Sequence, residues 1–468
     1  MSPLSRLATA LEQEDLTRPD GRVSDLIGLL AEATGLDAEV GEQCTIETGR
    51  HRDPVPAEVV GFRAGRTLLM PLGELAGVGP GTRVRASGRP TAMTMGDDLL
   101  GRIVDGLGRP LDGRGPLQGR QRPLAASPPA ALERPPIRER VGLGVRALDT
   151  LVPCGRGQRL GIFAGSGVGK SSLLGMIARS TEADVNVIGL VGERGREVRE
   201  FVERDLGDAL SRSVVVVATS DQPALVRIKA AFAATAVAEH FRDQGLDVML
   251  MMDSVTRFAM AQRELGLAIG EPPATRGYPP SVFALLPRLL ERSGTSAHGS
   301  ITGLYTVLVD GDDMNEPVTD AVRSILDGHV VLTRELAHRG HYPAIDVLQS
   351  VSRLADQVVS PEVADAARVL RTTLAAHRDK QDLISIGAYR HGADPTVDAA
   401  LRHSERVDAF LRQDLADLST PAAADAALLA LAGDLAPAAT SPAGDEVDAE
   451  LVADTGTTAI PPLHLSLR

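Results

Sequence analysis

The stretch AGSGVGKS, residues 164–171, decides the fold of this chain. It follows an apolar run, Leu160–Phe163, that is typical of a buried strand, and it precedes a helix-like segment that begins at Ser172. Glycines let a backbone wrap tightly, so that successive N–H groups point at a phosphate group in front of a helix N-terminus. The pattern therefore predicts a nucleotide-binding P-loop between a strand and a helix.

Each position of this loop has an expected role. Lys170 is expected to reach the β and γ phosphates of ATP, and the hydroxyl of Ser171 to bind Mg²⁺. The alternative is a glycine-rich turn with an accidental lysine, but the chain has just three lysines, at positions 170, 229 and 380. The candidate nucleotide-binding residues of the loop are Ala164, Gly165, Ser166, Gly167, Val168, Gly169, Lys170, Ser171 and Ser172.

Around the loop, residues 141–353 alternate between apolar runs and helix-like segments. Near-continuous apolar strands of this kind belong in a parallel sheet that is covered on both faces, so we expect an α/β core. The predicted strands are Leu160–Phe163, Val185–Val191, Val214–Ala218, Val248–Met252 and Tyr305–Val309.

The two ends of the chain differ from the core in their sequence patterns. Short strands separated by glycine and proline predict a small β-barrel before the core, and the segments Pro361–His377 and Pro395–Asp417 predict helices after it. An Ala/Pro-rich end predicts a disordered tail. The expected division is 1–20 for a partner-binding segment or a frayed terminus, 21–95 for the barrel, 96–358 for the ATPase domain, 359–432 for the helical domain and 433–468 for the tail.

Composition restricts the function classes. The chain has 468 residues, of which 43% are hydrophobic and 24% charged, as in a soluble globular protein. Its net charge of −13 argues against sequence-independent binding of nucleic acid. We see no signal peptide and no apolar run of the roughly 20 residues that a membrane span needs. Cys44 and Cys154 have no nearby Cys or His partner, which favours inert thiols in a cytoplasmic protein.

Two acidic residues are candidates for the chemistry beside the P-loop. The run Val185–Val191 is followed by Gly192 and Glu193, and a carboxylate at the end of a strand could activate the attacking water. A surface cluster of mixed charges is the alternative for that segment. The run Val248–Met252 ends in Asp253, the Walker B pattern, in which the carboxylate holds Mg²⁺ through its water shell.

The segment PAIDVLQSVSR, residues 343–353, resembles the signature of the α/β ATPase family that includes the rotary ATP synthase subunits. The resemblance implies that Arg353 is an arginine finger, inserted into the site of a neighbouring subunit. It also implies that Tyr342 packs on adenine, for which a core tyrosine is the alternative, and that Arg257 lies near the γ-phosphate. Catalytic members of the family carry glutamate where this chain has Glu193, and non-catalytic members carry glutamine.

The likeness covers about residues 21–432 and is strongest to the protein-export branch. LMPLGEL, residues 69–75, and IGAY, residues 386–389, resemble the flagellar export ATPases, and virulence-type secretion ATPases are the alternative. A Rho-type RNA translocase is a more distant alternative, since residues 21–95 contain one aromatic, Phe62, where an RNA-binding barrel needs several.

The resemblance implies a RecA-like P-loop ATPase core between the barrel and the helical domain, active in a homohexamer. It implies catalytic roles for Lys170, Glu193, Arg194 and Arg353, and metal binding by Ser171, Asp253 and Glu197. The implied partners are a stator-like regulatory protein at the N-terminus, export gate proteins at the inner membrane and export chaperone–substrate complexes, with no nucleic acid. The expected location is the cytoplasm, peripherally attached to the membrane export apparatus.

Overall fold

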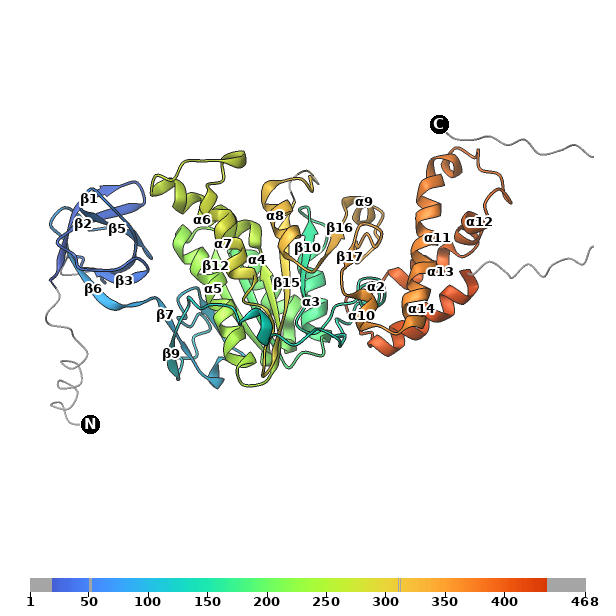
Figure 1. The fold of residues 1–468 in the computed structure, drawn as a ribbon, viewed down its shortest axis with the longest axis horizontal. Helices are drawn as coiled ribbons and strands as arrows, with labels where there is room; N and C mark the ends of the chain where they lie inside the picture. Colours follow the sequence, from blue (N-terminus) through green and yellow to red (C-terminus); the bar gives the residue numbers. More distant parts are fainter. Residues whose placement is uncertain (1–18, 50–52, 310, 312, 436–468) are drawn as a thin grey trace, which may run out of the picture.

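The computed structural model describes residues 19–49, 53–309, 311 and 313–435. Along its longest axis lie a barrel, a central α/β body and a helical part, in chain order (Figure 1). The predicted partner-binding segment 1–20 and the predicted tail 433–468 lie outside the described residues, apart from residues 19–20 and 433–435. The three-part fold class predicted from the sequence is confirmed.

The first part is a closed β-barrel in which the strand order is β1-β2-β5-β4-β3-β6. Side chains alternate between its interior and solvent, and those of Cys44 and Ile46 on β3 point into the barrel core. The strands are β1 (Gly21–Ile27), β2 (Leu30–Thr34), β3 (Glu42–Ile46), β4 (Val55–Arg63), β5 (Arg66–Pro71) and β6 (Arg83–Pro90).

The connection from the barrel to the core contains short strands. β7 (Ala92–Met95) pairs with β9 (Arg120–Pro123) in a separate two-stranded sheet. β8 (Ile103–Asp105) pairs with β12 (Ser213–Thr219) and extends the core sheet.

The central body contains, within the described residues, a nine-stranded sheet in the order β17-β16-β10-β15-β13-β11-β12-β8, with β14 beside β15. Its pairings are parallel except for those of β14 and β17. The remaining strands are β10 (Arg159–Ala164), β11 (Val185–Glu193), β12 (Ser213–Thr219), β13 (Asp247–Asp253), β14 (Gly294–Thr295), β15 (Ser300–Leu308), β16 (Gly328–Leu332) and β17 (Val351–Ser352).

Helices cover both faces of this sheet, because its strands are apolar on both sides. On β11, the neighbouring residues Val187 and Ile188 are both fully buried but belong to different apolar layers. One layer contains α5, α6 and α7 and reaches the barrel; the other contains α2 and α3 and reaches the helical part. The helices are α2 (Arg146–Leu151), α3 (Lys170–Ser180), α4 (Gly195–Glu200), α5 (Ala224–Arg242), α6 (Val255–Ala268), α7 (Pro280–Leu290), α8 (Pro317–Ile325), α9 (Arg334–His338) and α10 (Ala355–Val358).

The C-terminal part differs in detail from the two predicted helices. The first helix, α11 (Pro361–Ser385), continues past His377 because no glycine or proline interrupts it before Gly387. The second is not continuous over 395–417, since His403, with a φ of −108°, separates α12 (Pro395–Arg402) from α13 (Ser404–Leu411). A further helix, α14 (Pro421–Leu435), packs against α11 and α2.

Two predictions made from composition are tested by this fold. Cys44 and Cys154 are buried and unpaired, and burial raises the pKa of the Cys44 thiol to about 12, so both thiols are inert as expected. No helix in the described part of the chain is long and apolar enough to cross a membrane.

Candidate active site

The predicted site residues gather where three strands of the sheet end. β10 leads into the P-loop, β11 ends at Glu193, and β13 ends at Asp253, all at the carboxyl edge of the parallel sheet. In the loop, Gly167 and Gly169 have φ values of 80° and 89°, which only glycine adopts without strain. The helix α3 begins at Lys170, so its N-terminus faces the same edge.

Lys170 connects the loop to both predicted acidic residues. Its ammonium contacts the Asp253 carboxylate and lies 3.7 Å from Oε1 of Glu193. Burial alone would lower the pKa of Lys170, but the charges of Asp253 and Glu193 outweigh it, so the pKa is raised. Lys170 is therefore held in its charged form at the point where it could meet a phosphate group.

Asp253 is fixed by a residue that the sequence analysis missed. The Thr306 hydroxyl on β15 donates a hydrogen bond of 2.7 Å to Oδ1 of Asp253. Thr306 lies within the apolar run predicted as the strand Tyr305–Val309. A polar residue in such a buried run needs a hydrogen-bond partner, and this was the signal that could have identified it. The bond orients the carboxylate toward Lys170.

The residues predicted to bind Mg²⁺ supply the right atoms for it. Ser171 presents an exposed hydroxyl at the start of α3, and Asp253 presents a carboxylate, and oxygen is the ligand that Mg²⁺ prefers. The described residues contain no group of three or more His, Cys, Asp or Glu side chains that could hold a metal alone.

Glu193 has the environment of a general base. Burial and the charge of Asp253 raise its pKa to about 7, against the opposing effect of Lys170. Its Oε1 is buried and makes no hydrogen bond among the described residues, with the Lys170 ammonium 3.7 Å away. The carboxyl group thus changes protonation near neutral pH and has an acceptor atom that no hydrogen bond uses.

The turn before Glu193 depends on a glycine. Gly192 has a φ of 74°, and a Cβ atom there would lie 2.9 Å from Cβ of Arg257. No side chain fits this position without moving α6, which carries Arg257. Gly192 therefore allows Glu193 and Arg257 to approach one another.

Arg257 and Tyr342 both lie beside the P-loop. Nε of Arg257 is buried and has no hydrogen-bond partner among the described residues. A Cβ atom on Gly169 would lie 3.5 Å from two ring carbons of Tyr342, whose side chain is half exposed. Both groups are placed where a nucleotide in the loop could contact them.

Arg194 and Glu197 lie at the margin of this site. They form an exposed ion pair of 3.2 Å at the start of α4, where Arg194 is the residue before the helix, and 74% of the Arg194 side chain is exposed. Glu197 still influences its neighbour, because its hydrogen bond and charge add to the rise in the pKa of Glu193. Glu197 thus acts on the Glu193 carboxyl, while Arg194 points toward solvent.

Arg353 does not join the other candidates. β17 runs antiparallel to β16 and pairs Ser352 with Gly328, at the amino end of the neighbouring parallel strands. Arg353 follows at once, and its backbone N–H donates a bond of 3.0 Å to the carbonyl of Asp327. Its exposed side chain is therefore at the edge of the sheet opposite the P-loop.

Comparison with known proteins decides the family. Residues 144–352 match the nucleotide-binding domain of the ATP synthase alpha/beta family, and residues 23–88 match its beta-barrel domain. The flagellum-specific ATP synthase of Bacillus subtilis (strain 168) is 52% identical over 431 residues, which cover 91% of this chain and 98% of that protein. The chain belongs to the ATP synthase alpha/beta family. Residues 359–430 match the T3SS EscN ATPase C-terminal domain, which marks the export branch of the family.

Other members of the ATP synthase alpha/beta family have a comparable sequence identity to this chain. The type 3 secretion system ATPase of Xanthomonas euvesicatoria is 50% identical over 422 residues, 88% of this chain and 95% of that protein. The assembled ATPase EscN from the type III secretion system of enteropathogenic E. coli has a TM-score of 0.84 and 45% identity, over 88% of this chain and 100% of that one. EscN in complex with its central stalk EscO has a TM-score of 0.82.

Proposed function

We propose that this export ATPase hydrolyses ATP in a homohexameric ring and energises flagellar protein export. The main support for a ring is the position of Arg353, which lies at the edge of the sheet opposite the P-loop of its own chain. An arginine there can act on a nucleotide only in another protomer. Family membership supplies ATP as substrate, and the similarity to assembled EscN supports the ring.

The reaction follows from the side chains at the carboxyl edge. The Glu193 carboxylate accepts a proton from a water molecule, whose oxygen attacks the γ-phosphorus, and the bond to the β–γ bridging oxygen breaks to release ADP. Lys170 compensates negative charge on the β and γ phosphates, and Arg257 approaches the γ-phosphate from α6. Mg²⁺ held by Ser171 and Asp253, with Glu197 near its water shell, would neutralise phosphate charge.

In this proposal the adenine ring packs against Tyr342, whose half-exposed ring lies beside Gly169. Arg353 of the adjacent protomer completes the site and stabilises charge on the transferred group. Arg194 contacts the site of its own chain only through its exposed ion pair with Glu197, within the described residues, so we place any direct contact of Arg194 with the nucleotide in the adjacent protomer.

The partners belong to the same proposal. Relatives named flagellum-specific ATP synthase make a flagellar export apparatus at the inner membrane the favoured setting, with gate proteins and chaperone–substrate complexes as partners. A regulatory protein would bind the N-terminal segment 1–20. The second candidate function is type III secretion outside the flagellum, which the similarity to EscN favours.

Activity as a function of protein concentration tests the ring. The turnover rate per protomer should rise steeply as protomers assemble, and a flat response would overturn the proposal. Arg353→Ala should lower kcat by about 10³-fold or more even in assembled protein. Arg368→Ala removes another exposed arginine, on α11, and serves as the control.

The biological setting has its own test. Deleting the gene in its host should abolish flagellar filaments, and loss of a different secreted product with intact flagella would select the second candidate. Stimulation of ATP hydrolysis by RNA, and not by an export chaperone, would instead indicate an RNA translocase.

A further inference from the structure

We propose that Gln158 is a positioning residue for Arg353. Its side-chain amide fixes the segment 351–353, which ends in Arg353. It thereby fixes where this arginine enters the site of the next protomer. The inference rests on the proposed function, because it gives Arg353 its role in that site.

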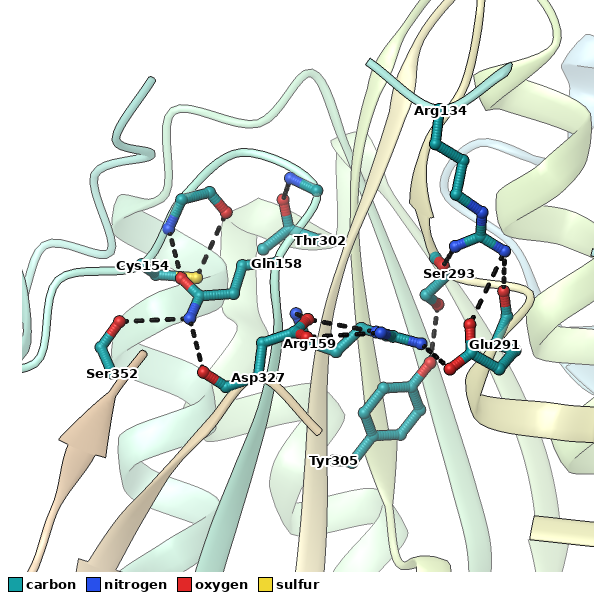
Figure 2. Close-up of polar contacts among 12 residues, drawn as sticks. Arg134, Cys154, Gln158, Arg159, Glu291, Ser293, Thr302, Tyr305, Asp327 and Ser352 are labelled. Carbon is teal, nitrogen blue, oxygen red and sulfur yellow. Dashed lines mark hydrogen bonds and ion pairs between the residues drawn. The ribbon is translucent and has the colours of Figure 1, made fainter. Parts of the chain in front are cut away.

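Gln158 is fully buried, and its two amide hydrogens bond to Ser352 of this segment and to Asp327, the residue to which the N–H of Arg353 also bonds (Figure 2). Nε2 donates to the carbonyl of Asp327 and to Oγ of Ser352, each at 3.1 Å. Oε1 accepts the N–H of Gly155 at 2.7 Å. The side chain therefore spans the start of β10, the residue before β16 and the last residue of β17.

Residues 351–353 have few backbone restraints of their own, whereas Ser350, just before them, is held by Val331 and Arg371. β17 contains two residues and pairs with β16 only through Ser352 and Val351. The backbone N–H of Arg353 then donates to the same Asp327 carbonyl that accepts from Gln158. A strand this short gains much of its definition from side-chain bonds, so the loss of Gln158 would leave the backbone at Arg353 held only by the pairing with β16 and the bond to Asp327.

Asp327, which accepts both bonds, is itself fixed. Its carboxylate accepts from the backbone N–H of Arg159 at 3.1 Å and from the guanidinium of Arg159 at 3.2 and 3.3 Å. The other end of that guanidinium pairs with Glu291 at 2.6 Å (Figure 2). Arg159 begins β10, the strand that ends at the P-loop, so one strand anchors both Arg353 and the nucleotide loop.

Directional bonds distinguish this arrangement from ordinary packing. A leucine could fill the space of Gln158, but it could not orient Asp327 and Ser352. An arginine that stabilises transferring phosphate must be placed closely, and a displacement of about 1 Å can cost on the order of 10²-fold in rate. The exposed side chain of Arg353 has no partner of its own among the described residues to correct such a displacement.

The test compares Gln158→Leu with a matched control, in assembled full-length protein. Gln158→Leu should lower kcat by about 10- to 100-fold, with KM for ATP unchanged within about twofold. Thr302→Val removes a different buried bond, from the N–H of Gly157 at 2.8 Å, at the same end of the sheet. It does not contact residues 351–353, and it should keep kcat within about twofold of the parent protein.

A double-mutant comparison with Arg353→Ala decides whether Gln158 acts through Arg353. Residual hydrolysis is measured under single-turnover conditions, with enzyme in excess over ATP. Once Arg353 is absent, Gln158→Leu should change the rate by less than about twofold. An equal loss in both backgrounds would overturn the inference, as would a normal kcat for Gln158→Leu.

Sedimentation velocity establishes that each variant still assembles. If Gln158→Leu does not assemble, Ser352→Ala replaces it. This variant removes only the bond between the Gln158 amide and the hydroxyl of the partly exposed Ser352, and kcat should fall by about two- to fivefold. A normal kcat for Ser352→Ala in that case would overturn the inference. A normal kcat for Arg353→Ala would instead overturn the proposed function.

Discussion

At the residue scale, burial and the charge of Asp253 give Glu193 a pKa of about 7. A base must be deprotonated to accept a proton, so kcat/KM of the nucleotide-free enzyme should rise with pH and reach half its maximum near pH 7. Glu197 contributes to the raised pKa, so Glu197→Gln should move this midpoint to lower pH. A pH–rate profile measures both, and a midpoint near 4.5, the ordinary glutamate value, would assign the base to another group.

Replacing the carboxylate itself separates chemistry from binding. Glu193→Gln should lower kcat by about 10²- to 10⁴-fold and leave nucleotide affinity intact, since Lys170 and the P-loop remain. Turnover and a fluorescent-nucleotide titration give the two quantities. Glu203→Gln removes an exposed carboxylate paired with Arg199 and should leave both unchanged. Surviving turnover in Glu193→Gln would show that Glu193 is structural.

At the element scale, the turn at the end of β11 should tolerate no side chain. Gly192→Ala forces a Cβ atom against Arg257 at a φ of 74°, so kcat should fall at least about tenfold and stability by about 1–3 kcal/mol. Gly195→Ala is the matched control, because a Cβ atom there meets nothing within 4 Å. Equal activities of the two variants in a steady-state assay would contradict this reading of the turn.

The elements differ in how far the sequence predicts them. The five strands predicted in the core, and the P-loop between β10 and α3, could be predicted because long apolar runs and a glycine-rich loop act locally. The break at His403 and the two-residue strand β17 could not, since tertiary contacts define them. The same holds in the site. Glu193 and Asp253 could be predicted because each follows an apolar strand, whereas the contacts of Thr306 and Gln158 depend on which strands become neighbours.

At the scale of the whole molecule, an ion pair between a buried glutamate and a partly buried lysine joins the barrel to the core. Lys229 on α5 lies 2.6 Å from Glu58 on β4, whose carboxylate also accepts a 2.5 Å bond from Thr91. Lys229→Met would leave the buried Glu58 charge unpaired and should reduce the free energy of unfolding by about 3 kcal/mol. Lys380→Met, at an exposed position on α11, should change it little.

Urea unfolding measures this difference. Adding Glu58→Gln to Lys229→Met should restore part of the loss, because the uncompensated charge is then gone. If Lys229→Met is as stable as Lys380→Met, the attachment of the barrel depends on the apolar contacts of Leu30, Met70 and Leu72 instead.

Arg353 and the P-loop lie at opposite edges of one sheet, so in the proposed ring each protomer has a direction, with the arginine on one face and the nucleotide loop on the other. Protomers that join through these two faces can associate only head to tail. In the proposed arrangement a pair then has one complete site, and every open row has one fewer complete site than it has subunits. Closure into a ring completes that last site without any additional protein.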